Sequence, residues 1–210
     1  MGNFLTFFDT LKYTLINTWP MLTLFIVILT VVRLSNVIIN KEKFVFYQDF
    51  YRLLGILYIL LLYYLLLTTE GASRGVNFIP FREMTRYSFG SKSFFYNVIG
   101  NIALFIPFGF FVTGTVKAKK ISEITLITII ISLTAELIQY RIGRAFDVDD
   151  IILNTTGSIL GFVAFTGISG IANKLPKFLQ NNIFYNILAV LVLIGIVLLL
   201  SIAIFGIGWF

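Results

Sequence analysis

Residues 94–116 read FFYNVIGNIALFIPFGFFVTGTV, a run of 23 residues without a charged side chain. A helix needs roughly 20 consecutive apolar residues to cross the hydrocarbon core of a bilayer. The run therefore predicts a membrane-spanning helix. Pro107 lies inside it and predicts a kink, because proline removes a backbone hydrogen bond from the helix.

The composition of the whole chain points to the same class of protein. Of its 210 residues, 58% are hydrophobic and only 12% are charged, whereas a soluble domain carries about 25% charged residues. So little charge cannot cover a water-exposed surface, and so much apolar sequence excludes disorder. Segments of suitable length and hydropathy predict six spans, at residues 19–39, 53–69, 94–116, 121–140, 151–171 and 184–209.

The segments outside the spans complete the expected architecture. Residues 1–18 mix apolar and charged side chains, which favours an interfacial helix leading into the first span. The longest polar connections, residues 41–52 and 71–92, are too short for a soluble domain. We expect residues 1–210 to form a single all-α membrane domain, a polytopic bundle of about six transmembrane helices.

The residue inventory limits the chemistry. The chain has no Cys and no His, so thiolate chemistry is absent, and so are the usual general base and the usual transition-metal ligand. Any catalysis must use carboxylates, hydroxyls, amides, Lys or Arg. The net charge is +6. In a membrane protein, an excess of basic residues usually sets the orientation of the spans or contacts anionic lipids, so we expect no nucleic-acid partner.

The basic residues divide almost evenly between the two membrane sides. Alternating spans place eight on one side: Lys41, Lys43, Arg52, Lys117, Lys119, Lys120, Lys174 and Lys177. They place seven on the other: Lys12, Arg74, Arg82, Arg86, Lys92, Arg141 and Arg144. The second set lies among acidic and aromatic residues typical of a site. With the site arginines discounted, residues 117–120 are expected in the cytoplasm and the site loops outside the cell.

Polar residues recur at helical spacing near the ends of three spans, and such residues are costly in a membrane. They are Asn97 and Asn101 in the third span, on one stripe with Gly100 and Phe108, then Glu136 and Gln139 in the fourth, and Asp150 and Asn154 in the fifth, on one face with Gly157 and Gly161. Alternating spans bring these ends to one membrane side, together with the loops at residues 77–82 and 141–150. We therefore expect the polar residues to converge.

These residues also have structural interpretations. Asn101 and Gln139 can simply join helices through hydrogen bonds. Gly157 and Gly161, four residues apart, favour close helix packing, and the acids before residue 151 can cap the fifth helix. Glu136 differs, because a carboxylate inside the bilayer boundary needs a cation, a proton or a donor. An ion pair with Arg144 or Arg82 can provide one, and so can a ligand.

Four motifs stand in order along residues 77–161. They are N-x-I-P-F at 77–81, N-x-x-G-N followed by F-x-P-x-G at 97–109, S-x-x-x-E-x-x-Q at 132–139, and R-x-x-D-x-D-D-x-x-x-N-x-x-G-x-x-x-G at 144–161. With this set the sequence resembles the VanZ-like family. The resemblance implies a multi-pass protein of the cell membrane in a family whose founding member is associated with resistance to the lipidated glycopeptide teicoplanin.

The leading hypothesis is a protein that contributes to glycopeptide resistance by binding a head group in an outer-facing polar pocket. The ligand would be a lipid-linked cell-wall precursor or the lipidated antibiotic, which meet at the outer leaflet. The expected binding residues are Asn77, Pro80, Phe81, Arg82, Asn97, Asn101, Glu136, Gln139, Arg144, Asp147, Asp150 and Asn154. Arg82, Arg86 and Arg144 suit phosphate or carboxylate groups. The other expected partners are membrane lipids, and no cofactor is expected.

Two alternatives stay open. In the first, the chain is an enzyme acting on a lipid-linked envelope intermediate, with Glu136, Asp147, Asp149 and Asp150 as candidate catalytic residues. These carboxylates could hold Mg²⁺, which prefers oxygen ligands, or activate a water molecule. In the second, the polar residues only assemble a structural or scaffold protein. The sequence leaves open whether a reaction is catalysed and what the oligomeric state is.

Overall fold

The computed structural model describes residues 2–68 and 75–205, with side chains for 13–67 and 75–202. Within these residues, six helices are long and apolar enough to cross a membrane: Tyr13–Ile39, Phe46–Leu67, Lys92–Val116, Ile121–Arg141, Val148–Ala172 and Asn182–Ile202. The six predicted spans are therefore confirmed. The described fold is helical except for one pair of two-residue strands.

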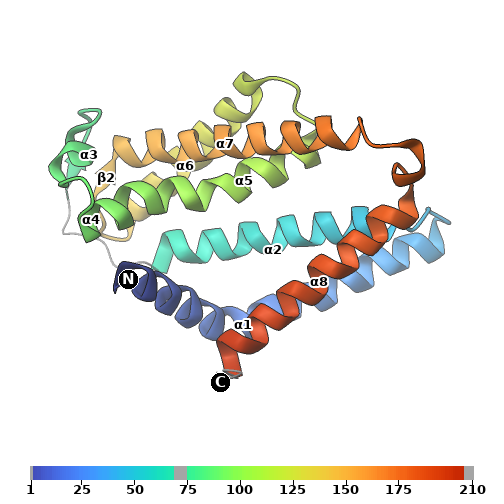
Figure 1. The fold of residues 1–210 in the computed structure, drawn as a ribbon. Helices are drawn as coiled ribbons and strands as arrows, with labels where there is room; N and C mark the ends of the chain where they lie inside the picture. Colours follow the sequence, from blue (N-terminus) through green and yellow to red (C-terminus); the bar gives the residue numbers. More distant parts are fainter. Residues whose placement is uncertain (1, 69–74, 206–210) are drawn as a thin grey trace. The chain divides into compact units, whose positions relative to one another are not determined.

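The elements follow one another along the chain as Figure 1 shows. They are α1 (Gly2–Ile39), α2 (Phe46–Thr68), β1 (Val76–Asn77), α3 (Arg82–Arg86), α4 (Lys92–Phe94), α5 (Gly100–Val116), α6 (Ile121–Arg141), β2 (Phe146–Asp147), α7 (Val148–Ala172) and α8 (Asn182–Phe205). A π-helical turn, Phe95–Ile99, joins α4 to α5, and a 3-10 turn, Lys177–Leu179, precedes α8.

The N-terminal helix is continuous with the first span. The sequence predicts an interfacial helix over residues 1–18 that leads into this span, and α1 runs unbroken from Gly2 to Ile39 with Pro20 inside it. Proline removes one hydrogen bond, and a membrane helix tolerates this loss without ending. The side chains of residues 1–12 lie outside the described part of the chain, as does the end of the last predicted span at residues 206–209.

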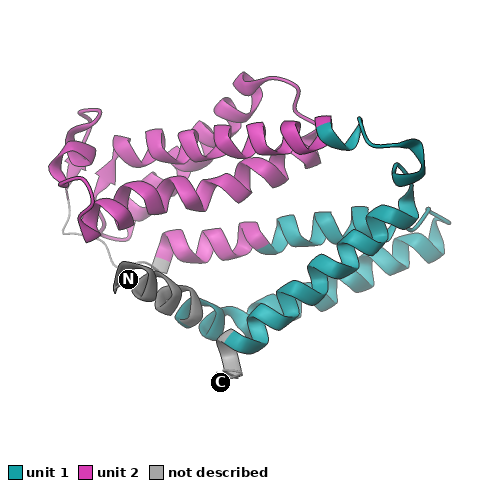
Figure 2. Ribbon diagram, viewed as in Figure 1, with its two compact units in different colours: residues 1–57, 171–210 teal, residues 58–170 magenta. Residues whose placement is uncertain are grey.

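The chain forms two compact units: unit 1 holds residues 1–57 and 171–210, and unit 2 holds residues 58–170 (Figure 2). In unit 1, Arg33 donates its Nε–H to Asp49 Oδ1 over 2.8 Å and also pairs with Glu42. These ion pairs explain how a charged residue is accommodated in a span. The backbone N–H of Tyr47 donates to Asn186 Oδ1 on α8 over 3.0 Å.

The core of unit 2 lies among the buried side chains Leu62, Phe105 and Phe108. Tyr58 on α2 donates its hydroxyl hydrogen to the backbone oxygen of Leu104 on α5. Apolar contact and this hydrogen bond together fix the C-terminal part of α2 against α5. Helix association in lipid depends on such packing and polar contacts.

Helices α5 and α7 pack closely through glycine. A Cβ atom built on Gly109, Gly157 or Gly161 would lie 2.1 or 2.2 Å from a backbone oxygen of the facing helix. No side chain fits at that distance, so the backbones meet directly. The predicted packing role of Gly157 and Gly161 is confirmed, and Gly109 supplies the matching position on α5.

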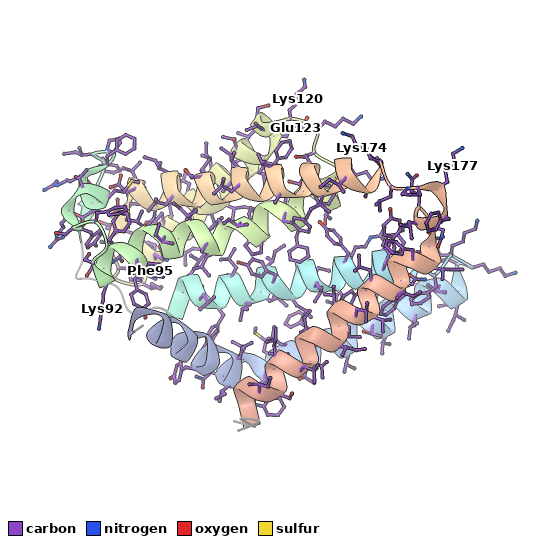
Figure 3. All side chains as sticks on the ribbon, viewed as in Figure 1. Lys92, Phe95, Lys120, Glu123, Lys174 and Lys177 are labelled. Carbon is purple, nitrogen blue, oxygen red and sulfur yellow. The ribbon has the colours of Figure 1, made fainter. Side chains whose placement is uncertain are left out.

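The two ends of unit 2 differ in character. At one end, Lys117 ends α5 with a left-handed backbone, and Glu123 begins α6 by accepting the N–H groups of Lys119 and Lys120 over 2.8 and 3.2 Å. Figure 3 shows Lys120 and Glu123 at this end, away from Lys92 at the start of α4. The other end holds α3, the paired strands and the candidate site.

Candidate functional site

The two short strands join loops that lie about 70 residues apart in the sequence. Strands β1 and β2 pair in parallel, with Val76 opposite Phe146 and Asn77 opposite Asp147. Asn77 Nδ2 donates to Asp147 Oδ1 over 2.8 Å, and Asn77 Oδ1 accepts the N–H of Ile79 over 3.1 Å. The N-x-I-P-F motif is thereby fixed beside the start of α7.

Asp149 fixes the short helix α3 from the first turn of α7. Its side chain is buried, with 1% of the residue exposed. Oδ1 accepts the N–H of Phe81, and Oδ2 accepts those of Glu83 and Met84 over 2.8 and 3.1 Å. The carboxylate thus caps α3 across the fold, whereas the sequence suggested a cap for the fifth span.

Phe81 is held in an uncommon backbone conformation at the beginning of α3. Its φ of +67° lies in the left-handed region, which costs a residue with a side chain about 1–2 kcal/mol. The hydrogen bond from its N–H to Asp149 offsets part of this cost. The Phe81 side chain consequently points outward and is 56% exposed.

Glu136 and Asp147 meet through the backbone. Glu136, 2% exposed, accepts the N–H of Asp147 at its Oε2 over 2.9 Å. Asp147 Oδ1 accepts the N–H of Asp149 over 2.9 Å. Burial raises the pKa of the Asp147 carboxyl above its usual value, although the hydrogen bonds from Asp149 and Asn77 act in the opposite direction.

Two amide side chains connect the three long helices of the site. Asn101 Nδ2 on α5 donates to Asp150 Oδ1 on α7 over 2.6 Å. Asn154 Nδ2 on α7 donates to Ser132 Oγ on α6 over 2.8 Å. The predicted convergence of these helix ends is confirmed by these contacts.

Asn97 does not join this convergence. Its side chain is exposed and donates to the backbone oxygen of Ser93, one turn earlier, over 2.9 Å. The expected stripe of Asn97, Asn101 and Phe108 assumed α-helical spacing throughout. The π-helical turn Phe95–Ile99 breaks that spacing, because its hydrogen bonds span five residues, and so turns Asn97 away from the other two.

Gln139 and Arg144 bind the end of α2. Gln139 Nε2 and Arg144 Nη1 both donate to the backbone oxygen of Leu66, over 2.7 and 2.6 Å. The last carbonyl groups of a helix need such donors. No described Lys or Arg side chain forms an ion pair with Glu136, so the pairing of Glu136 with Arg144 or Arg82 is not what the structure shows.

The remaining predicted binding residues border the site. Pro80, Phe81 and Arg82 have exposed side chains, and Arg86 pairs with Glu83 over 3.1 Å within α3. We use the name polar cluster for seven polar residues at this end of unit 2: Asn77, Asn101, Glu136, Arg144, Asp147, Asp149 and Asp150.

The polar cluster is acidic overall. Arg144 is its one cation, against the four carboxylates of Glu136, Asp147, Asp149 and Asp150. Among residues 2–68 and 75–205, no three acidic side chains are arranged to hold a metal ion. Both oxygens of Asp149 are engaged by backbone N–H groups, so this carboxylate has a structural role.

The sequence interpretation missed two polar groups of unit 2. Ser158 is fully buried on α7, and its Oγ has no partner in the described part of the chain. Its spacing of four residues from Asn154 could have indicated it, because residues i and i+4 share a helix face. The Leu66 carbonyl had no such signal, because every residue carries the same backbone group.

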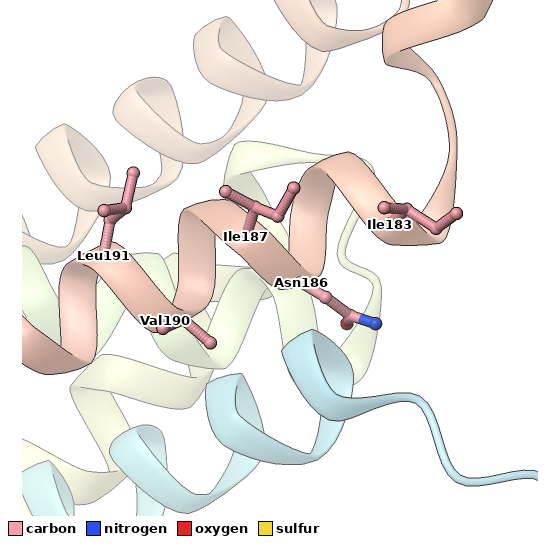
Figure 4. A pocket seen from close by; sticks show the side chains of 5 residues that line it. All are labelled: Ile183, Asn186, Ile187, Val190 and Leu191. Atoms are coloured by element: carbon pink, nitrogen blue, oxygen red, sulfur yellow. The ribbon is translucent and has the colours of Figure 1, made fainter.

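A hollow of about 300 Å³ lies on α8 in unit 1 (Figure 4). Its lining consists of Ile183, Asn186, Ile187, Val190 and Leu191. The amide oxygen of Asn186 already accepts the Tyr47 N–H, and the other side chains are aliphatic. This apolar surface suits lipid chains and adds no polar chemistry.

Comparison with known proteins covers the same part of the chain. The profile of the VanZ/LLP1 family matches residues 50–173, which include all of unit 2. Protein VanZ of Enterococcus faecium is 33% identical over 95 residues, which cover 44% of this chain and 56% of that protein. The match thus spans little more than half of the relative's length. No solved structure matches the chain.

Proposed function

Because the chain belongs to the VanZ/LLP1 family of membrane proteins, we propose that it contributes to teicoplanin-type glycopeptide resistance by binding a polar head group in the polar cluster. The ligand is a lipid-linked cell-wall precursor or the lipidated antibiotic. Both present a polar head on an apolar chain, and the exposed apolar faces of the spanning helices suit such a chain.

The observation that supports this proposal most is the state of Asp150. Its Oδ1 accepts the amide of Asn101, and the residue is only partly buried. No other described group donates a hydrogen bond to its side chain. Asp150 therefore offers an acceptor to a ligand, whereas both oxygens of the neighbouring Asp149 are occupied.

The charge of the polar cluster indicates which groups of a head group fit. Carboxylates accept hydrogen bonds from hydroxyl and ammonium groups and repel phosphate. A sugar or amino group accordingly fits beside Asp150. A phosphate or carboxylate fits the exposed Arg82, which lies outside the acidic interior.

The proposed orientation places the polar cluster at the outer leaflet and residues 117–120 in the cytoplasm. The lysine-rich turn at the opposite end of unit 2 supports this orientation through the positive-inside preference. An outer-facing cluster would reach cell-wall precursors and the antibiotic without transport across the membrane.

The test compares variants in a glycopeptide-susceptible bacterial host at matched membrane levels. Asp150→Asn keeps an oxygen for Asn101 and removes the charge, and Lys119→Gln serves as a control at the other end of unit 2. We expect the wild-type and Lys119→Gln proteins to protect against the lipidated glycopeptide, and protection to fall several-fold with Asp150→Asn. Full protection by Asp150→Asn would contradict the proposed site.

Mass spectrometry of envelope lipids and cell-wall precursors in the same cells separates binding from catalysis. Identical profiles with and without the protein are expected for a binding protein. A species that appears with the wild-type protein and disappears with Asp150→Asn would instead identify an enzyme and the class of its substrate.

A further inference from the structure

The segment between β1 and α5 exposes large apolar side chains outside the spanning helices. Phe78 is 73% exposed and Phe89 is 92% exposed, and Ile79 and Phe81 are also exposed. Such groups on a surface loop indicate a binding or membrane-contact surface. We use the name loop patch for these four residues.

Basic residues lie in the same segment as the loop patch. Arg82, Arg86 and Lys92 are all exposed, and Arg86 has 71% of its side chain accessible even though it pairs with Glu83. Lys92 is also the first residue of the span Lys92–Val116. The loop is therefore continuous with the end of this span, where the helix enters the bilayer.

The exposure of the loop patch is built into the fold. Asp149 accepts three backbone N–H groups from the segment, and the Phe78 ring packs on Phe146 with 5.3 Å between centroids. The left-handed backbone of Phe81 is retained although it is unfavourable. Strained residues of this kind persist where the surrounding structure holds them, and they concentrate at functional surfaces.

We propose that residues 78–92 dock into the head-group layer of the leaflet beside the polar cluster, with anionic phospholipid as the partner. The apolar side chains enter the boundary of the acyl chains, and Arg82, Arg86 and Lys92 bind lipid phosphates. Charge complementarity and continuity with the span favour a lipid surface over a soluble protein. This proposal does not depend on the head-group site at Asp150.

The turn at the other end of α5 provides the contrast within unit 2. Residues 117–120 carry three lysines and no aromatic residue. We expect this charged turn to lie in water, so a probe placed there is the control for a probe in the loop patch.

Tryptophan fluorescence tests the proposal in the full-length protein. The native Trp19 and Trp209 are replaced by Phe, and one Trp is introduced by Ile79→Trp, Phe89→Trp or Lys119→Trp. Vesicles contain phosphatidylcholine and phosphatidylglycerol with brominated acyl chains, which quench a nearby indole. We expect blue-shifted, strongly quenched emission from both loop reporters and weaker quenching from Lys119→Trp.

A second measurement tests the role of the cations. Bromine is placed on phosphatidylglycerol alone or on phosphatidylcholine alone at equal mole fraction. The preference of the Phe89→Trp reporter for the anionic lipid should fall by about fivefold for each of Arg82→Gln and Arg86→Gln, as expected for a basic group at a lipid surface.

Three outcomes would overturn the proposal. Water-like, unquenched emission from both Ile79→Trp and Phe89→Trp would show a loop in solvent, available to a soluble partner. Emission that changes with the protein-to-lipid ratio would show contact between copies of the chain. Equal quenching by the two lipids in the wild-type background would remove the anionic preference. Two reporter positions keep the test valid if one variant fails to fold.

Discussion

Asp147 and Asp149 lie two residues apart and have the same side chain, but their hydrogen bonds differ. Asp147 receives its side-chain bonds at Oδ1, from Asn77 and from the N–H of Asp149. Asp149 accepts backbone N–H groups at both oxygens. At Asp147, an amide side chain can still accept both hydrogen bonds through its one oxygen. At Asp149, an amide would place its NH₂ group against a backbone N–H donor.

We predict that Asp149→Asn lowers the free energy of unfolding by about 1–3 kcal/mol, the cost of leaving buried hydrogen-bonding groups unsatisfied. The matched variant Asp147→Asn should stay within about 0.5 kcal/mol of the wild type. Thermal unfolding in lipid nanodiscs, followed by circular dichroism, measures both. Equal losses in the two variants would contradict the structural role assigned to Asp149.

Among the helices, the contact of α5 with α7 depends on glycine at particular positions of α7. Gly157 and Gly161 face backbone atoms of α5 at a distance too short for a Cβ. Gly167 and Gly170, further along α7, have nothing within 4 Å of the corresponding position. The same helix thus contains both the sensitive sites and their controls.

We predict that Gly157→Ala and Gly161→Ala each destabilise the protein by about 1–3 kcal/mol, because the added methyl group forces the helices apart. Gly167→Ala should be neutral or stabilise by up to about 1 kcal/mol, since alanine favours a helix over glycine. Unfolding midpoints in one detergent provide the comparison. A loss with Gly167→Ala as large as with Gly157→Ala would show that helix flexibility, rather than contact, requires the glycines.

For the molecule as a whole, the spans divide the loops between two membrane sides. The span Lys92–Val116 separates the loop that contains Ser88 from the turn that contains Lys119. The chain has no Cys, so a single introduced thiol reports its own position without a background signal.

We predict that Ser88→Cys reacts with a membrane-impermeant maleimide in intact cells and that Lys119→Cys reacts only after permeabilisation. Both side chains are exposed in the structure, so access to the reagent depends on the membrane side. The reverse pattern would invert the proposed orientation. Labelling of both thiols from outside would contradict the single span between them.

The amino-acid sequence was sufficient to predict the spans, the packing glycines and the meeting of three helix ends. Each depends on properties that the residues carry along the chain: hydropathy over about 20 residues, and positions that repeat with the period of a helix. Gly157, Gly161 and the contact of Asn101 with Asp150 agree with predictions of this kind. The motif order in residues 77–161 also indicated the family.

The remaining features of the site required the folded chain. Asp149 caps α3 by accepting backbone N–H groups that include that of Phe81, and Gln139 and Arg144 cap α2 by donating to the backbone oxygen of Leu66. Every residue type carries such a carbonyl, and every type except proline carries such an N–H group. The π-helical turn directs Asn101 toward Asp150 and Asn97 away from it. Their separation of four residues in the sequence predicted instead that both lie on one helix face. Backbone hydrogen bonds between distant segments carry no residue signature, so three-dimensional packing determined which polar side chains support the fold and which, like Asp150, have a single side-chain hydrogen bond among the described residues.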